Sequence, residues 1–134
     1  MITGITHVVR YISNEEQAIA FYRDMLDFEV KMDNPMGTPE QRWLTMNLPA
    51  QPQMELVLMN PNGWFKGQAL EDAVAQIGKQ PQLILATDDI DALQAKFKTA
   101  GHFASEVNTT PWGKDVQLRD PFGNSIYVVQ NLAA

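Results

Sequence analysis

The feature that most constrains the fold is an internal repeat that runs through nearly the whole chain of 134 residues. At an offset of 75 residues, segment 7–11 aligns with 82–86. At an offset of 72 residues, segment 54–58 aligns with 126–130. Repeated supersecondary units bury a shared core, and ligand cavities often lie between such units. The repeat therefore predicts two related modules with a cavity along their seam.

The first copy is predicted to span residues 4–59 and to form a βαβββ unit. Residues 5–11 alternate in the way a strand with two different faces does. Ser13 and Glu16 have capping-box spacing, and the apolar residues after them recur at helical intervals, so a helix is expected to begin near Asn14. Three further strand patterns follow, at residues 28–32, 42–48 and 54–59.

The second copy is predicted to span residues 81–131, after a linker of residues 60–80 that contains a short amphipathic helix at 69–77. An aspartate pair at 88–89 precedes a helical apolar stripe that stops at Gly101. Three strand patterns belong to this copy, at residues 83–87, 115–119 and 125–130. Strand, helix and stop thus recur in the same order as in the first copy.

Composition and charge exclude several classes of function. The formal charge of −6, the pI near 4.7 and the absence of a Lys/Arg cluster argue against a nucleic-acid partner. No run approaches the ~20 apolar residues that span a bilayer, and the first residues do not resemble a signal peptide, so we expect a soluble, cytoplasmic protein with no membrane partner. Because the chain has no cysteine, a metal would need His, carboxylate, amide or phenol ligands.

Five sequence motifs, all in order, carry a family resemblance over almost the whole chain. They are I-x-H-V at residues 5–8, A-F-Y-R-D-M-L-D-F at 20–28, M-E-L-V at 54–57, T-D-D-I at 87–90 and D-P-F-G-N at 120–124. Together they resemble the vicinal oxygen chelate superfamily, which includes glyoxalase I, bleomycin-resistance proteins, fosfomycin-resistance transferases and extradiol dioxygenases. The resemblance implies an α+β fold in a single domain over residues 1–134, with two βαβββ modules that form curved mixed sheets around a cavity. It also implies a homodimer.

In metal-using members of this superfamily, ligands lie on the first and last strands of each module. The matching positions in this chain hold His7, Glu55, Gln82 and Tyr127. Imidazole and carboxylate suit Zn, Ni, Mn or Fe, so His7, Glu55 and Gln82 are the candidate ligands and Glu55 is the candidate catalytic group. Tyr127 stands where glyoxalase I has a proton-transferring carboxylate, and a neutral phenol is a poor base at pH 7. We therefore expect ordinary glyoxalase I activity to be absent.

Other chemistries of the superfamily fit the residues less well. Extradiol dioxygenases need two histidines and a carboxylate around Fe(II), and fosfomycin-type transfer in this superfamily uses two histidines and a glutamate. The chain's second histidine, His102, follows the helix stop at Gly101 and lies away from all four ligand positions. Ser-His-Asp catalysis, a phosphate-binding loop and a nucleotide fingerprint find no support in the sequence.

Each polar candidate also has a purely structural interpretation. His7 fits a hydrogen-bonded core histidine, and Glu55 fits a carboxylate on a solvated edge strand, although burying it unpaired would be costly. Gln82 fits a plain polar strand end, and Tyr127 fits a core or cavity-wall phenol.

Aromatic residues and arginines supply the candidate ligand contacts. We expect Trp43 and Trp112 to line the cavity, together with Tyr127, because flat rings offer large apolar contact areas. The residues 64–65 are expected to anchor the linker on the core instead. Arg119 is a candidate for binding an anionic group of a substrate, although arginines beside strands are usually solvated or paired with an acid.

Three functions remain open at this point. The first is a small-molecule-binding protein of the bleomycin-resistance kind, which holds a neutral or cationic ligand in the sheet cavity near the dimer seam. The second is a metal-assisted lyase or isomerase of the glyoxalase kind, in which His7 and Glu55 hold the ion. The third is a structural or regulatory dimer. We favour the first, because the second module lacks both strong ligand types, and we leave open whether the protein is an enzyme.

Overall fold

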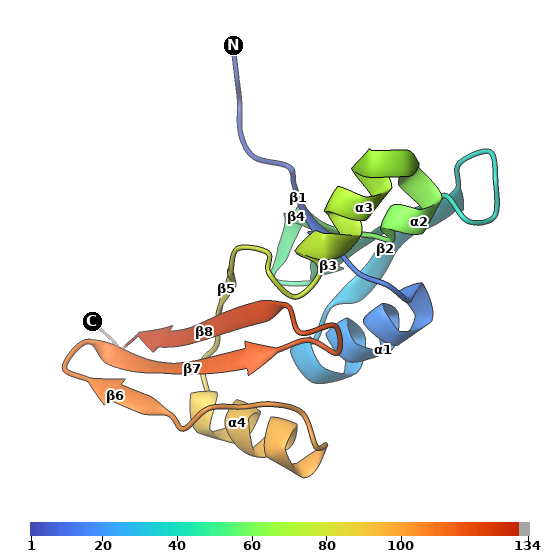
Figure 1. Ribbon diagram of the computed structural model, residues 1–134. Coiled ribbons are helices and arrows are strands. Elements are labelled where there is room, and N and C mark those ends of the chain that lie inside the picture. The colour runs from blue at the N-terminus through green and yellow to red at the C-terminus, as the bar shows by residue number, and fades with distance from the viewer. Residues whose placement is uncertain (132–134) are drawn as a thin grey trace. The chain divides into compact units, whose positions relative to one another are not determined.

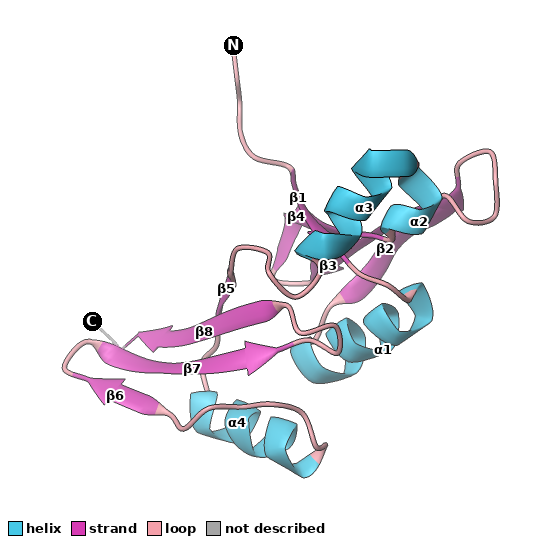
Figure 2. Ribbon diagram, in the orientation of Figure 1, coloured by secondary structure: helices cyan, strands magenta, loops and turns pink. Residues whose placement is uncertain are grey.

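The structure is a computed structural model that describes residues 1–131, and it consists of two compact units, Met1–Ile77 and Gly78–Ala134. Each unit is a βαβββ module with a four-stranded mixed sheet (Figure 1, Figure 2). The α+β fold with two such modules confirms the fold class predicted from the repeat. Among residues 1–131, no helix combines the length and apolar character needed to cross a membrane.

The first unit contains a sheet with the strand order β1-β4-β3-β2. Its elements are β1 (His7–Tyr11), α1 (Glu15–Leu26), β2 (Glu29–Pro35), β3 (Arg42–Leu48), β4 (Gln51–Met59), α2 (Pro61–Trp64) and α3 (Gly67–Gln76). β1 pairs with β4 in parallel, and the other two pairs are antiparallel. The parallel pair requires a crossover, and α1 lies on it.

The two faces of this sheet are packed against different parts of the unit. On one face, buried side chains of α1 such as Phe21 and Tyr22 pack with the buried strand residues Leu44 and Leu56. The other face, which we call the open face of the first unit, carries the alternate residues of the same strands. α3 borders this face at the end of β1, and Trp64 of α2 packs on it against Trp43 of β3 (Figure 1). On this face His7 and Val9 are accessible to solvent, whereas Thr45 and Val57 are buried.

Helix α1 begins one residue later than the predicted capping box. Asn14 is the N-cap, and its side-chain oxygen accepts a hydrogen bond of 2.9 Å from the backbone N–H of Gln17. The predicted box between Ser13 and Glu16 is therefore wrong, because the capping geometry requires an acceptor three residues before the bonded N–H. The predicted start near Asn14 is confirmed.

Strand boundaries in the first unit differ from the predicted ones. β2 continues to Pro35, beyond the predicted end at residue 32, because Asp33 and Asn34 pair with Leu44 and Trp43 of β3. Cross-strand pairing outweighs the low strand propensity of Asp and Asn, and an edge strand tolerates proline. β4 likewise begins at Gln51, which leaves only two residues in the preceding turn.

The second unit contains a sheet with the order β5-β8-β7-β6, and helix α4 packs on one face of it. Its elements are β5 (Leu83–Ala86), α4 (Ile90–Thr99), β6 (Asn108–Thr110), β7 (Gly113–Arg119) and β8 (Ser125–Asn131). α4 buries Ile90 and Phe97, and the N-cap is Asp89, whose side chain accepts from Ala92 N–H. β6 lies outside the strand segments predicted from the sequence. The opposite face, the open face of the second unit, carries the alternate polar positions.

The Asp120–Asn124 turn is held by buried polar contacts. Asp120 accepts hydrogen bonds of 2.9 Å from the backbone N–H groups of Phe122 and Asn124. The Asn124 side chain donates to Asp120 and accepts from Gly78 N–H and Gln80. Asp120 and Asn124 are both buried. This family-like motif is therefore structural, because it ties the start of the second unit to the β7–β8 turn.

Candidate functional site

The first unit brings His7 and Glu55 together on its open face. The two residues are register partners in the parallel β1–β4 pair, so their side chains project to the same side. His7 Nε2 lies 3.4 Å from Glu55 Oε2, and the exposed fractions of the two side chains are 36% and 18%. The pair is thus half-buried but reachable from solvent, which is the state expected of a ligand-binding acid and base.

Two threonines hold this pair in orientation. Thr45 Oγ1, from the buried Thr45 of β3, donates a hydrogen bond of 2.8 Å to Glu55 Oε1. Thr6 Oγ1 lies 2.8 Å from His7 Nδ1. When Nε2 carries the proton, the N–H group faces the Glu55 carboxylate, and Nδ1 accepts from the Thr6 hydroxyl. Such outer contacts fix the tautomer and direction of a functional histidine.

Neither threonine was singled out from the sequence, although alternation along β3 places Thr45 on the same face as Trp43. A threonine on a strand has no chemical signature of its own. Only the register of β3 against β4, with Thr45 opposite Val57, reveals that it lies diagonal to Glu55.

An aromatic wall borders the polar pair. The Trp43 ring lies 5.9 Å from the His7 ring, with the two planes at 53°. Trp64 packs edge-on against Trp43 at 6.2 Å. Trp43 therefore lies next to the candidate ligand residue His7. Trp64 was expected only to anchor the linker, but α2 brings it into this wall.

The donor set of the first unit fits a divalent ion in part. His7 Nε2 and Glu55 Oε2 supply one nitrogen and one oxygen, and Thr6 and Thr45 orient them from behind. Within residues 1–131, no group of three or more His, Asp and Glu side chains gathers in a way that would hold an ion. Structural and catalytic zinc sites use three or four protein ligands. Further ligands would have to be water, substrate or amide and phenol oxygens.

Tyr127 and Asp115 meet on the open face of the second unit. They form a side-chain hydrogen bond, and Tyr127 lies two residues before Val129, the register partner of Asp115. Burial raises the pKa of the Tyr127 phenol above its ordinary value, and the hydrogen bond and negative charge of Asp115 raise it further. The pair has the same diagonal relation as Thr45 and Glu55. Tyr127 is therefore neutral at pH 7 and unsuited to act as a base.

Gln82 lies just before β5 and contacts the β7 side chain Gln117, whose Oε1 accepts a hydrogen bond of 2.9 Å from Gln82 Nε2. Gln117 in turn donates to Ser125. The register partner of Tyr127 on β5 is Ile84 and not Gln82. The structure thus differs by two residues from the repeat alignment, and the second unit holds an amide network where the first holds an imidazole and an acid.

The remaining candidates lie on the surface of their units. Trp112 is 73% exposed in the turn before β7, so its ring is available to a ligand but is not part of a wall within the second unit. The Arg119 guanidinium lies 4.8 Å from the Phe103 ring centre in a cation–π contact. Arg42 forms ion pairs with Glu16 and Asp33, as expected of a strand arginine.

Comparison with known proteins places these features in a family. The profile of the "Glyoxalase/Bleomycin resistance protein/Dioxygenase superfamily" matches residues 4–128. Protein YetH of Bacillus subtilis (strain 168) is 31% identical over 125 residues, which cover 92% of this chain and 95% of YetH.

Two solved structures of similar length show the same fold. The structure of UcmS2 has a TM-score of 0.83 and 26% identity, and the alignment covers 96% of this chain and 98% of UcmS2. TnmS3, described as an antibiotic binding protein from Streptomyces sp. CB03234, has a TM-score of 0.75 and 27% identity, with 98% of both chains covered. The chain therefore belongs to the glyoxalase, bleomycin resistance protein and dioxygenase superfamily, as its sequence motifs predicted.

Proposed function

We propose that this protein binds an aromatic small molecule with a neutral or cationic polar group on the open face of the first unit. The observation that carries the proposal is the oriented His7–Glu55 pair beside the Trp43–Trp64 wall. Binding sites combine apolar and aromatic walls with a few well-placed polar groups, and this face has both. The formal charge of −6 also favours a neutral or cationic ligand over an anionic one.

Each part of the face has a separate task in this proposal. The indole rings stack on a planar ligand and attract a cation through their π-faces. Glu55, held by Thr45, accepts a hydrogen bond from the polar group of the ligand or pairs with its positive charge. His7 contacts both Glu55 and Trp43, and it donates or accepts a hydrogen bond according to its tautomer. TnmS3 supports the assignment, because it is described as an antibiotic binding protein and shares the fold over nearly the full chain.

A titration monitored by NMR tests this proposal. A panel of planar aromatic antibiotics that includes metal-free bleomycin is added to the full-length protein labelled with ¹⁵N, and the three tryptophan indole signals are assigned from single Trp→Phe variants. We expect at least one compound to shift the Trp43 and Trp64 signals in a saturable way. Glu55→Gln should weaken the binding of that compound by about tenfold, as loss of a charge-assisted hydrogen bond does. Glu29→Gln, on the exposed edge strand β2, is the matched control and should bind normally.

Two results would contradict the proposal. One is a panel in which no compound shifts the two indole signals. The other is a compound that binds the Glu55→Gln and Glu29→Gln variants equally well, because binding would then not involve the polar pair.

A metal-assisted lyase or isomerase is the second candidate, favoured by the contact between His7 Nε2 and Glu55 Oε2. An ion held there would act as a Lewis acid on a substrate carbonyl. Calorimetric titration with Zn²⁺, Ni²⁺, Mn²⁺ and Fe²⁺ tests it. Stoichiometric binding that disappears in His7→Ala and persists in His102→Ala would support this candidate, because His102 lies in the second unit beside Phe97. Equal binding by both variants would reject it.

We infer further that the protein is a homodimer. β1 is an edge strand, and Val8 and Val9 on it, together with Ile5 just before it, are exposed apolar residues. Exposed apolar edges are uncommon in monomers and usually mark an interaction surface.

A further inference from the structure

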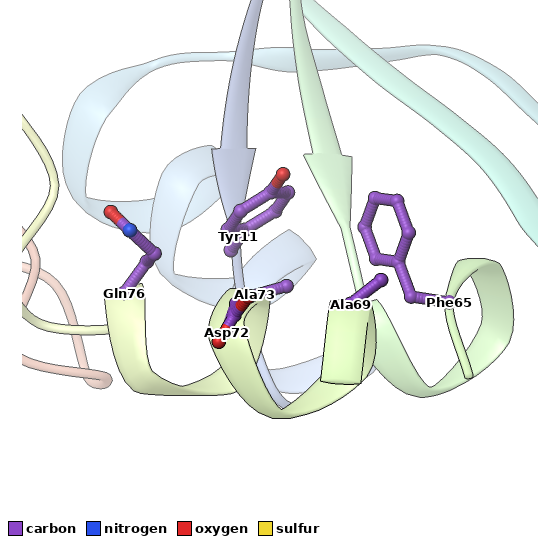
Figure 3. A pocket seen from close by; sticks show the side chains of 6 residues that line it. All are labelled: Tyr11, Phe65, Ala69, Asp72, Ala73 and Gln76. Carbon is purple, nitrogen blue, oxygen red and sulfur yellow. The ribbon is translucent and has the colours of Figure 1, made fainter. Parts of the chain in front are cut away.

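A pocket of about 280 Å³ lies within the first unit, between the end of β1 and helix α3 (Figure 3). It is lined by Tyr11, Phe65, Ala69, Asp72, Ala73 and Gln76. Tyr11 lies on the open face, but none of the six residues belongs to the His7–Glu55 pair, to the threonines that orient it or to the Trp43–Trp64 wall. Tyr11 follows His7 by four residues on β1, which is about 13 Å along a strand. The pocket is therefore lined by other residues than the His7–Glu55 site of the same unit.

Aromatic rings and small side chains form the walls of this pocket. The Tyr11 and Phe65 rings pack edge to face, with centres 6.0 Å apart and planes at 81°. Ala69 and Ala73 are one helical turn apart on α3 and point toward Tyr11 (Figure 3). Their methyl groups leave the space that a larger side chain would fill, so the apolar part of a small ligand has both a floor and a ring wall.

Asp72 and Gln76, also one turn apart on α3, supply the polar groups of the pocket. Asp72 Oδ1 accepts a hydrogen bond of 2.8 Å from Gln68, which fixes the carboxylate while leaving it further acceptor sites. α3 contains Glu71 and Asp72 but no basic residue. Within the described residues, no Lys or Arg forms an ion pair with Asp72. The charge of the pocket is therefore negative and accessible.

We propose that this pocket binds a small organic ammonium ion with an apolar body, such as an arylalkylamine in its protonated form. The carboxylate of Asp72 pairs with the ammonium group, and the rings of Tyr11 and Phe65 attract the cation and contact the apolar body. The volume lies just below the roughly 300 Å³ at which pockets for drug-sized ligands begin, so the ligand is fragment-sized. This site goes beyond the proposed function, because it uses none of the same residues.

Benzylammonium is the probe that tests this inference, and benzyl alcohol is its uncharged counterpart. Both are titrated at pH 7 into the full-length ¹⁵N-labelled protein, and amide shifts are followed in Tyr11, Phe65 and α3. We expect saturable shifts with benzylammonium and binding at least threefold weaker with benzyl alcohol, as about 0.7 kcal/mol of charge interaction predicts. Asp72→Asn should weaken benzylammonium binding by about threefold.

Matched variants separate a built site from general attraction of a cation to an acidic protein. Glu71→Gln removes the same charge from the neighbouring position outside the pocket lining and should bind benzylammonium normally. Ala69→Leu, at an exposed position, should fill the pocket and remove the saturable shifts. Equal weakening by Asp72→Asn and Glu71→Gln, equal binding of the two probes, or binding that survives Ala69→Leu would overturn the proposal. His7→Ala should leave the titration unchanged, so failure here is distinct from failure of the ligand face.

Discussion

Glu55 and Arg42 lie on neighbouring parts of one sheet, yet their partners give them different roles. Arg42 is paired with Glu16 and Asp33, so its charge is used within the protein. Among residues 1–131, the Glu55 carboxylate is held by His7, which is itself reachable from solvent, and by Thr45, which orients it. A charged side chain with a fixed orientation and an accessible partner is available for a ligand, and this difference depends on contacts rather than on residue type.

Thr45 is expected to stabilise the fold as well as to orient Glu55. Thr45→Val keeps the shape but removes the donor to Glu55 Oε1, so it should lower the free energy of unfolding by about 1–2 kcal/mol. Thr45→Ser retains the hydroxyl and should recover most of the hydrogen-bond contribution. Urea denaturation followed by circular dichroism measures both variants. A loss that is the same in Val and Ser would show that the hydrogen bond contributes nothing.

The Tyr127 phenol should titrate at a higher pH than an ordinary tyrosine, because burial and Asp115 raise its pKa. A folded pKa above the unfolded value stabilises the protein fully below the unfolded pKa, and this contribution is lost as the pH rises through the folded pKa. The effect is therefore confined to alkaline pH. Asp115→Asn should lower the Tyr127 pKa, measured from the ¹³Cζ shift, whereas Asp88→Asn should not. An unchanged value in Asp115→Asn would refute the assignment.

Helix ends show how a difference of one residue affects stability. Asn14→Ala removes the acceptor for Gln17 N–H and should cost about 1 kcal/mol of unfolding free energy. Ser13→Ala is the matched control, because the capping role predicted for Ser13 is absent from the structure, and it should change stability by less than about 0.5 kcal/mol. Thermal unfolding of the two variants distinguishes them. A larger loss of stability in Ser13→Ala would support the predicted capping box instead.

The turn between β7 and β8 should be a strong determinant of stability in the second unit. Asn124→Ala removes contacts to Asp120, Gly78 and Gln80 from a buried site and should cost about 2–4 kcal/mol. Asn62→Ala, at an exposed position in α2, should stay within about 0.5 kcal/mol. Urea denaturation gives both values, and a near-neutral Asn124→Ala would contradict a structural role for the motif.

Strong periodic segments were predictable, and boundaries were less so. α1 and α4 were expected because their apolar residues recur at helical spacing and stop signals follow them. β6 and the extension of β2 were missed, because their residues become strand only through pairing with β7 and β3. Such pairing energy comes from residues distant in the sequence, which local propensity does not contain.

At the scale of the whole molecule, the exposed edge strand β1 is expected to determine the assembly state. We expect a mass near twice 15.1 kDa in light scattering coupled to size-exclusion chromatography. Val8→Lys, on the exposed edge, should shift the mass toward that of one chain, because a charge on an edge strand opposes association. Val74→Lys, exposed on α3, is the matched control and should not change the mass. A wild-type protein with the mass of one chain would refute the homodimer.

The order of motifs was enough to predict the superfamily and the α+β class, and the roles of His7, Glu55 and Trp43 stay predictions. These inferences hold because residue type, periodicity and order are properties of the chain itself. The sequence also showed that the second module holds no imidazole or carboxylate at the matched ligand positions, because this depends only on which amino acids occupy them.

The contacts between the residues of the site were visible only in the folded structure. Thr45 orients Glu55 only because β3 and β4 pair in a particular register, and Trp64 meets Trp43 only because α2 returns over the open face. The counterpart of His7 opposite Tyr127 is Ile84, two residues from the one chosen by alignment, because hydrogen-bond register sets side-chain partners. A linear pattern specifies which face a residue occupies, and three-dimensional packing specifies which neighbour it meets there.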